Sequence, residues 1–398
     1  MRLSTNFVLL AAASSPFIEG VYCWGAAGHE IVATIAQIHL LPSTLRVICD
    51  LLGVVPTDDS EATLRRQCHV STIATWADRD KYRMRWSAPL HYVGAVGDHP
   101  RGTCLFPGEG GWAGSKGINV LDGIKNTTHI LADWSGVSEH TSTSLSPSRT
   151  SRLALPGPLE IEAFKFLVHF VGDMHQPLHL TGRDRGGNSQ KVYFENRQTN
   201  LHSAWDTAIL TRLIRTVPSN YSRPLPDMPD TPSSQVEMSL RHAIYDPLIR
   251  RVMWEGVEGA WAEDVEEWLT CPAIAVNPNG PPQPSTLNIL ASALTSPAKL
   301  VHAVSSAFKE RIEIQPDGPL VCPYYWSVPL HQLNCEYVWP SVLNVAASAP
   351  RPRKYPTLDT PEYMAALDKN LVMERLVAQG GLRLAGILNW LFADPSEV

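Results

Sequence analysis

His169-Phe170-Val171-Gly172-Asp173-Met174-His175-Gln176-Pro177-Leu178-His179 is the stretch of this 398-residue chain from which its fold can be predicted. It continues an apolar, helix-like segment that begins near Ile161. His169 and Asp173 are four residues apart, so on a helix they project from the same face, one turn apart. Pro177 lacks a backbone donor and is expected to bend or end the helix. The stretch therefore predicts a helix that carries two metal-ligand residue types on one face.

The same spacing returns further along the chain. His202 and Asp206 stand four residues apart in Leu-His-Ser-Ala-Trp-Asp, within another segment of helical pattern. His179 follows the predicted helix break, where a turn of the chain can direct it towards the same cavity. Imidazole and carboxylate are ordinary zinc ligands. Two His/Asp pairs and a histidine after a helix break make a metal centre the first hypothesis for the site.

The overall charge and hydropathy narrow the class of protein. A net charge of −6 excludes the global basic field that is typical of nucleic-acid-binding proteins. Any attraction for an anionic substrate must therefore be local, and a metal cluster can supply it. Beyond the N-terminal leader, no stretch reaches the roughly 18 uninterrupted apolar residues of a membrane span. The mature protein is expected to be soluble, without a membrane partner.

The N-terminal 23 residues are expected to be a secretory signal peptide. Arg2 is the charged start, Phe7–Ala13 is the apolar run, and Val21 and Cys23 are small residues before a cut ahead of Trp24. Secretion is consistent with two possible N-glycosylation sequons, Asn126-Thr-Thr and Asn220-Tyr-Ser. The mature, extracellular chain is therefore expected to begin at Trp24.

The cysteine count agrees with an oxidising compartment. Removal of Cys23 from the seven cysteines leaves six. An even number in a secreted chain favours disulfides over thiolate metal ligands. Spacing suggests local Cys49–Cys68 and Cys322–Cys335 pairs, but connectivity cannot be read from sequence alone.

Apolar periodicity predicts an all-α architecture: one mainly helical domain over residues 24–398, decorated by long irregular surface loops. A short strand is expected at Lys191–Glu195, and the last helical segment is open to a break at Gly380-Gly381. Helices are expected at Trp24–His39, Ile118–Trp134, Ile161–Gln176, Leu201–Leu213, Val236–Val252, Trp254–Leu269 and Pro361–Phe392. Irregular segments are expected at Ser135–Pro158, Pro218–Pro232, Pro272–Pro284 and Cys322–Pro356.

Six segments, taken in their order, resemble the zinc-dependent class I nucleases of fungi and plants, the nuclease S-one and P-one family. They are Trp24-Gly25-Ala26-Ala27-Gly28-His29, Trp76-Ala77-Asp78, Leu90-His91-Tyr92, His169–His179, Gly186-Gly187-Asn188 and His202-Ser203-Ala204-Trp205-Asp206. A weaker match continues through Trp261-Ala262-Glu263 to Cys271 and the last helix. Each segment is weak evidence alone, but the ordered set is specific. The resemblance implies the mainly helical fold that this family shares with zinc-dependent phospholipase C.

The resemblance also implies three zinc ions. The first would be held by Asp78, His91, His169 and Asp173; the second by Asp173, His29 and the free amino group and carbonyl oxygen of Trp24; the third by His179, His202 and Asp206. Asp173 would thus bridge the first two ions. Because only a true N-terminus offers an α-amino nitrogen, the signal cut ahead of Trp24 would itself create a ligand. Three zinc ions against three aspartates leave a positive centre that attracts phosphate.

The implied activity is hydrolysis of single-stranded DNA and RNA to 5′-mononucleotides, with removal of phosphate from 3′-nucleotides, by a secreted monomer. Asp173 and Lys81 are the catalytic candidates, with Lys81 standing where the family often has a phosphate-binding arginine. Tyr92 occupies an aromatic position that the family uses to stack an unpaired base. Arg185, where a small apolar residue is common, and Asn188 are the other candidates for substrate binding.

One position departs from the family pattern. The family often carries an aspartate three residues after the histidine that matches His91, near the attacking water and the base, whereas this chain has Gly94. Asp98 is the nearby carboxylate that would have to replace it. Two alternative functions follow. One is a zinc-dependent phospholipase C, which shares the plan of three zinc ions; the other is a catalytically weak secreted protein that keeps zinc for stability.

Overall fold

The computed structural model describes residues 24–107, 110–115, 117–137, 153–272, 321–343, 354–394 and 396–397. The expected signal peptide, the Pro272–Pro284 excursion beyond residue 272 and most of the Ser135–Pro158 insertion lie outside these residues. Within them helices dominate, and the only sheet is a hairpin of β1 (Lys191–Phe194) and β2 (Arg197–Asn200). The strands pair antiparallel with Lys191 opposite Asn200. The all-α prediction and the short strand near Lys191 are confirmed.

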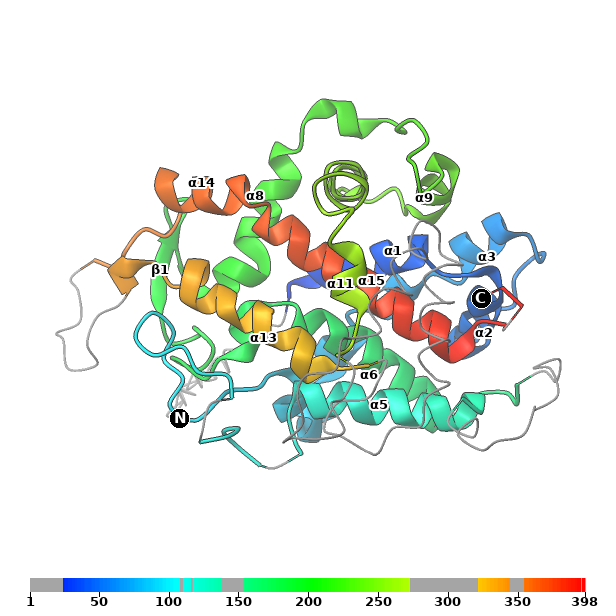
Figure 1. The fold of residues 1–398 in the computed structure, drawn as a ribbon, viewed down its shortest axis with the longest axis horizontal. Coiled ribbons are helices and arrows are strands. Elements are labelled where there is room, and N and C mark those ends of the chain that lie inside the picture. The colour runs from blue at the N-terminus through cyan, green and yellow to red at the C-terminus, as the bar shows by residue number, and fades with distance from the viewer. Residues whose placement is uncertain are drawn as a thin grey trace, which may run out of the picture.

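The central helix is α6 (Pro158–Met174), and α5 (Val120–Ser135) lies along it (Figure 1). Pro158 stands in the first turn, and the Glu160 carboxylate accepts a hydrogen bond from the Gly157 backbone N–H, so the start is well capped. The helix ends at Met174, three residues before Pro177, as expected. A short 3₁₀ helix over Pro177–Leu180 follows.

A second helix pair covers the other side of the core: α1 (Ala26–Ile38) packs along α15 (Val372–Phe392). The break that the sequence left open at Gly380-Gly381 does not occur, because α15 runs through both glycines. A Cβ on Gly381 would lie 2.4 Å from Cγ2 of Ile35, so the glycine permits close helix contact. The break instead falls at Leu371, which has a φ of 47° and separates α15 from α14 (Pro361–Lys369).

The remaining elements surround these pairs. The α-helices are α2 (Pro42–Leu52), α3 (Glu61–Gln67), α4 (Trp76–Asp80), α7 (Leu201–Ser203), α8 (Ile209–Thr216), α9 (Ser233–Ser239), α10 (Asp246–Arg251), α11 (Val265–Leu269) and α13 (Pro323–Leu333). Turns of 3₁₀ helix cover Val70–Thr72, Arg85–His91, Ser219–Ser222 and Ser341–Leu343. Turns of π-helix cover Ala204–Ala208, Val252–Ala260 and Asn334–Val338. The core between them is apolar and continuous.

Two expectations for the C-terminal half are wrong. The expected Val236–Val252 helix is interrupted between α9 and α10, where His242 takes a φ of 58°. The expected irregular stretch Cys322–Pro356 contains α13, because Pro323 stands in the first helical turn, where its missing N–H costs nothing. The Trp254–Leu269 segment is helical at both ends, with a turn between them.

Three disulfides cross-link the chain. Cys49–Cys68 joins α2 to the end of α3, as expected. The expected Cys322–Cys335 pair is wrong, and the bonds are Cys104–Cys335 and Cys271–Cys322. Because Cys322 and Cys335 flank α13, a rise of about 1.5 Å per residue puts them about 20 Å apart. A disulfide requires Cα atoms within about 7 Å, so the helix forbids the local pair.

Asn126 on α5 and Asn220 in the Ser219–Ser222 turn are both exposed, so both sequons are accessible. No helix among the described residues is long and apolar enough to cross a membrane.

Candidate metal centre

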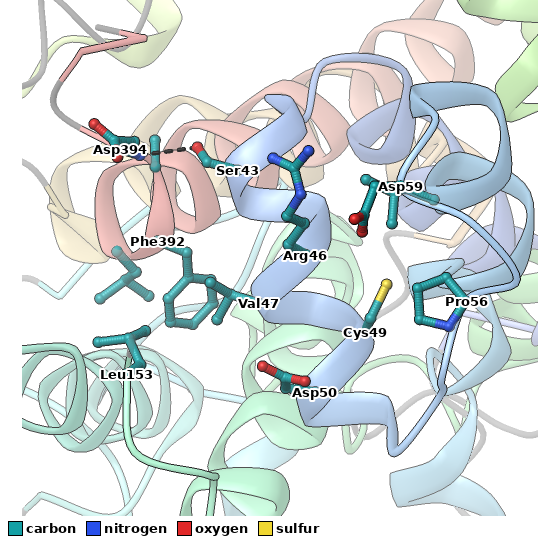
Figure 2. Close-up of a pocket in the computed structure, with 13 residues that line it drawn as sticks. Ser43, Arg46, Val47, Cys49, Asp50, Pro56, Asp59, Leu153, Phe392 and Asp394 are labelled. Carbon is teal, nitrogen blue, oxygen red and sulfur yellow. Dashed lines mark hydrogen bonds between the residues drawn. The ribbon is translucent and has the colours of Figure 1, made fainter. Parts of the chain in front are cut away.

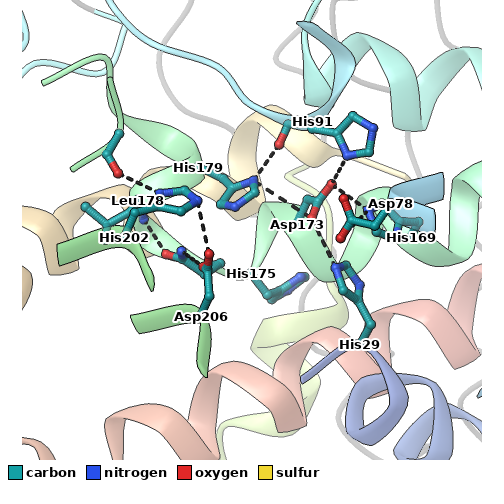
Figure 3. A network of polar contacts seen from close by, with 12 residues as sticks. His29, Asp78, His91, His169, Asp173, His175, Leu178, His179, His202 and Asp206 are labelled. Carbon is teal, nitrogen blue, oxygen red and sulfur yellow. Dashed lines mark hydrogen bonds and ion pairs between the residues drawn. The ribbon is translucent and has the colours of Figure 1, made fainter. Parts of the chain in front are cut away.

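Asp173, in the last turn of α6, lies at the centre of a buried cluster (Figure 3). One carboxylate oxygen, Oδ1, is 3.3 Å from Nε2 of His29, which α1 contributes. The other, Oδ2, is 2.9 Å from Nδ1 of His91 and 3.3 Å from Nε2 of His169. The two oxygens therefore face different histidines, which is the arrangement of a carboxylate that can bridge two metal ions.

Asp78 completes this side of the cluster. It lies in α4, partly exposed, with Oδ2 4.0 Å from Nε2 of His169. Side-chain atoms of His29, Asp78 and His169 all lie within 4.8 Å of one another. The rings of His29 and His169 stack with centroids 3.9 Å apart, so two helices present their imidazoles to the same small volume.

A second group stands beside the first. His179 from the 3₁₀ turn, His202 from α7 and Asp206 from the following π-helical turn have ligand atoms within 4.8 Å of one another. Nε2 of His202 is 3.2 Å from Oδ2 of Asp206. All three are buried. Nδ1 of His179 also lies 3.8 Å from Oδ1 of Asp173, so the two groups adjoin.

Backbone carbonyls set the orientation of three histidines. Nδ1 of His169 donates to the Ala74 carbonyl at 2.8 Å. In the same way, Nδ1 of His179 donates to the His91 carbonyl at 2.6 Å, and Nδ1 of His202 donates to the Gly186 carbonyl at 2.6 Å. A carbonyl oxygen only accepts, so the proton is on Nδ1 and the lone pair is on Nε2, facing the cluster. This outer hydrogen bond is how proteins orient metal-ligating histidines.

Gln176 is a residue of the site that the sequence did not reveal. Its buried side chain donates from Nε2 to Oδ1 of Asp206, and its Oε1 accepts from the Leu178 N–H at 2.6 Å. It thus holds both Asp206 and the turn that carries His179. Its place inside the central motif was the available signal, but glutamine is not among the usual zinc ligands, so only its contacts define its role.

Burial keeps three histidines of the cluster, His29, His91 and His179, neutral by lowering their pKa values. Burial, followed by the neighbouring His169, His179 and His91 imidazoles, holds the pKa of His29 well below its ordinary value. Burial likewise lowers the pKa of His91 to about 4. Neutral imidazole is the form that binds a metal. Burial also raises the pKa of Asp206 well above its usual range, an effect that a nearby cation would oppose because it favours the charged carboxylate.

The residues fit a metal ion. Buried side-chain nitrogens in native proteins are normally hydrogen-bonded. Nδ1 and Nε2 of His29, Nε2 of His169 and Nε2 of His179 are buried, and within the described part of the chain none has a hydrogen-bond partner. Imidazoles and carboxylates are the donor set that zinc takes. A bound cation would satisfy these nitrogens, which lack a hydrogen-bond partner among the described residues.

The start of the described chain lies beside the second group. The Gly25 N–H donates to the Asp206 carbonyl at 2.9 Å, and Trp24 is fully buried. A Cβ on Gly28 would lie 2.6 Å from Cε3 of Trp24, so the indole packs tightly on the first turn of α1. Trp24, His29 and Asp206 are therefore held close to one another.

The candidate substrate residues are exposed or partly exposed. Tyr92 follows His91 and is 47% exposed. Lys81 is the C-cap residue of α4. It lies close enough to His91 that its positive charge lowers the pKa of that histidine, an effect smaller than those of burial and of Asp78. Arg185 is exposed with a φ of 57°, and its carbonyl accepts a hydrogen bond from Asn188 Nδ2 at 3.0 Å.

Gly94 is tightly enclosed. A Cβ at this position would lie 2.9 Å from the Gly182 nitrogen, so the backbone itself leaves no room for a side chain. Asp98 does not replace the missing aspartate, because its oxygens already accept hydrogen bonds from Thr181 and the Leu105 N–H and contact His331 at 3.0 Å.

Two hollows lie away from the cluster. One of about 520 Å³ is lined by α2 and C-terminal residues, among them Ser43, Arg46 and Asp394 (Figure 2). It contains none of the clustered histidines. A third His/Cys grouping, Cys104, His331 and Cys335, is also unsuited to a metal, since its two cysteines form a disulfide. The His/Asp cluster is therefore the candidate site.

Comparison with known proteins agrees with this geometry. A family model described as S1/P1 nuclease matches residues 24–279. Endonuclease 2 of Arabidopsis thaliana is 30% identical over 276 residues, which cover 68% of this chain and 74% of that protein. Nuclease S1 of Aspergillus oryzae is 34% identical over 200 residues (50% of this chain, 58% of that protein), and nuclease P1 of Penicillium citrinum is 34% identical over 195 residues (48% and 60%).

The chain belongs to the S1/P1 nuclease family. It is accordingly a nuclease, a hydrolase that acts on nucleic acids. The family is zinc-dependent, and the His/Asp groups around Asp173 are suited to hold such ions.

Proposed function

We propose that the protein is a secreted phosphodiesterase with three zinc ions that hydrolyses single-stranded DNA and RNA to 5′-mononucleotides and removes phosphate from 3′-nucleotides. The observation that carries the proposal is the position of Asp173, whose two oxygens face separate histidines in a buried cluster with unsatisfied ring nitrogens. Membership of the S1/P1 nuclease family supports it.

The nine candidate ligands divide into three sets. The first is Asp78, His91, His169 and Asp173; the second is Asp173, His29 and the amino group and carbonyl oxygen of Trp24; the third is His179, His202 and Asp206. The contacts of Asp173 support the bridge between the first two sets. When bound, the zinc ions supply Lewis-acid stabilisation of phosphate charge and lower the pKa of water.

The protein's own side chains position the substrate. Asp173 contacts ligands of both the first and the second proposed zinc site, which makes it the first catalytic candidate. Lys81, at the end of α4 and close to His91, is placed to neutralise a phosphate oxygen. Because ammonium is a compact charge without the fork of arginine, it makes a single contact rather than a bidentate one.

Tyr92 supports the preference for single strands. A base stacks on an aromatic face only when it is unpaired, and such stacking is worth about 1–3 kcal/mol. Tyr92 is 47% exposed beside His91, so its side chain is accessible to a substrate. Arg185 and Asn188, in the turn that orients His202, are the other proposed contacts with the nucleotide.

Secretion and processing belong to the same proposal. The three disulfides and the exposed sequons at Asn126 and Asn220 are consistent with an extracellular protein. Removal of residues 1–23 would free the Trp24 amine beside His29 and Asp206. We further propose that the mature domain, residues 24–398, acts as a monomer.

The test is hydrolysis of single-stranded DNA and RNA by protein that begins at Trp24, before and after a zinc chelator. The proposal predicts 5′-mononucleotides, loss of activity on chelation and recovery with zinc. Phosphate release from 3′-nucleotides is measured in parallel, with a choline phospholipid as the control substrate. Head-group release without nucleic-acid cleavage would establish the phospholipase alternative instead.

A second measurement tests the N-terminal ligand. Native mass spectrometry should find three zinc ions in protein that begins at Trp24. The matched control carries one additional residue ahead of Trp24, which converts the amine into a peptide nitrogen. The control should hold one zinc ion fewer; three ions in both proteins would exclude Trp24 as a ligand.

A further inference from the structure

The segment between the candidate ligands Asp78 and His91 has an unusual composition for this acidic chain. Over residues 79–86, here called the 79–86 segment, the sequence is Arg-Asp-Lys-Tyr-Arg-Met-Arg-Trp. Its four cations against the single Asp80 give a local charge of +3 in a chain whose net charge is −6. A local excess of positive charge therefore lies next to the cluster in the sequence.

Two aromatic side chains alternate with these cations and are unusually exposed. Tyr82 is 65% exposed and Trp86 is 59% exposed. Large aromatic groups normally avoid water, so exposure of two within one short segment points to a partner that covers them. The combination of cations and exposed aromatic rings is that of a single-strand nucleic-acid surface.

The arginines of the segment are available. Arg79, Arg83 and Arg85 are exposed, and among the residues that the structure describes no ion pair links any of them to a carboxylate. Some arginines elsewhere are paired with carboxylates, such as Arg250 with Glu237 at 2.7 Å. An exposed, unpaired guanidinium keeps its full charge for a phosphate.

A continuous chain of rings connects the segment to the cluster. Trp86 contacts the Phe166 ring edge-on, with centroids 5.6 Å apart, and Phe166 stacks on Phe170 at 5.0 Å. Phe170 in turn contacts His91 edge-on at 5.3 Å. Trp86 is therefore connected through packed rings to a candidate metal ligand.

We propose that the 79–86 segment is an extended binding surface for the part of a single-stranded nucleic acid that lies outside the nucleotide at the metal centre. Tyr82 and Trp86 stack unpaired bases, while Arg83 and Arg85 contact backbone phosphates. The inference rests on the proposed function and adds to it: it makes the enzyme prefer long strands over dinucleotides and mononucleotides.

Local charge decides where the phosphates lie. Beyond Trp86 is a hollow of about 600 Å³ between α5 and α6, whose rim carries the Lys125–Asp122 pair and Glu162. That rim has no positive excess, so the strand's phosphates follow the arginines instead. Asn126, which lines the same hollow, carries a sequon, and the test is therefore made with Asn126→Gln in every protein.

The experiment compares zinc-loaded variants on a dinucleotide and on a single strand of about 12 nucleotides, a length that such surfaces bind. Trp86→Leu keeps apolar bulk but removes the π-face, whereas Trp86→Phe keeps a stacking ring. Tyr82→Ala and Arg66→Ala, the latter an exposed arginine on α3, complete the set.

Loss of one stacking ring should raise the KM for the long strand about tenfold in Trp86→Leu and in Tyr82→Ala. The KM for the dinucleotide and kcat should stay unchanged. Trp86→Phe should recover most of the affinity, and Arg66→Ala should resemble the wild type. An equal change on both substrates, or no change on the long strand, would overturn the inference.

A salt titration tests the arginines separately. Arg83→Ala/Arg85→Ala should reduce the slope of log KM against log salt by about 1.4, since each single-strand phosphate contact contributes about 0.7. An unchanged slope would exclude phosphate contacts. Binding of an uncleavable phosphorothioate strand, followed by anisotropy, gives a readout independent of turnover. If the wild type binds this strand through the 79–86 segment but cleaves no nucleic acid, the proposed nuclease function is wrong, whereas the proposed binding surface is still supported.

Discussion

Nδ1 of His202 donates to the Gly186 carbonyl across 2.6 Å, and this bond decides which ring nitrogen faces Asp206. Gly186 has a φ of 63°, and a Cβ there would lie 2.7 Å from the Leu178 carbonyl oxygen. Only glycine can therefore place the carbonyl where His202 needs it. The Gly-Gly turn contributes a backbone atom to the metal centre rather than mere flexibility.

Gly186→Ala should lower zinc affinity at the His179–His202–Asp206 group by about 10–100-fold, because loss of an outer hydrogen bond has that effect on metal sites. Equilibrium dialysis against a zinc buffer measures it. Gly53→Ala is the matched control: Gly53 has a similar φ of 66°, but a Cβ there meets no atom within 4 Å. The Gly53→Ala variant should have a strained backbone at residue 53 but should bind zinc as the wild type does. An equal loss of zinc affinity in both variants would contradict the proposed role of Gly186 in orienting His202.

Gln176→Leu should also weaken the same zinc group, by about 10–100-fold, since Asp206 loses the donor to Oδ1 and the Leu178 N–H loses its acceptor. The zinc affinity and the kcat on a single strand are the measurements. Gln332→Leu, at an exposed glutamine, is the control. A variant that binds zinc normally but unfolds more easily would show that Gln176 serves only the fold.

Gly94→Asp restores the aspartate that the family often carries, yet it should impair the protein. The new Cβ would meet the Gly182 nitrogen at 2.9 Å, and overpacking of this kind costs about 1–3 kcal/mol. The melting temperature and turnover should both fall. Gly182→Ala should be tolerated, because a Cβ there meets no atom within 4 Å. A stable, more active Gly94→Asp would mean that the loop adapts and that the aspartate position remains usable.

The ligand candidates could be predicted from sequence because helical geometry relates them. Spacing of four residues placed His169 with Asp173 and His202 with Asp206, and both pairs do converge. The orienting groups could not be predicted, since they are backbone carbonyls of Ala74, His91 and Gly186, and any residue type has a carbonyl. The sequence pattern identifies the metal ligands by their residue types. The backbone carbonyls that orient them depend on how the chain folds in three dimensions.

Long-range packing limited the prediction of the fold. Cys104 and Cys335 are 231 residues apart, and only α13 between Cys322 and Cys335 makes clear why the local pair is impossible. Gly381 suggests a helix break by its propensity, but contact with Ile35 of α1 overrides that propensity. In both cases the deciding interaction lies far away in the sequence.

His69 should make the folded protein sensitive to acid, independently of the metal ligands. Its Nε2 donates to the Ser239 carbonyl at 2.8 Å, and Nδ1 accepts from the Ser71 N–H at 3.2 Å, so the folded state holds a neutral ring. Burial lowers its pKa to about 4, with Arg241 and Arg65 acting in the same direction. In the unfolded chain the pKa is about 6.5.

Because the unfolded chain binds the proton more readily, the contribution of His69 to the free energy of unfolding is complete above about pH 6.5 and is lost as the pH falls towards 4. At about 1.4 kcal/mol per pH unit, the loss is about 3 kcal/mol. Denaturant unfolding of wild type and His69→Gln measures it, and zinc release affects both proteins alike. The variant should be less stable at pH 7, and the gap should shrink by about 3 kcal/mol at pH 4. A gap that does not change with pH would show that the imidazole of His69 is already protonated in the folded state or titrates identically when unfolded.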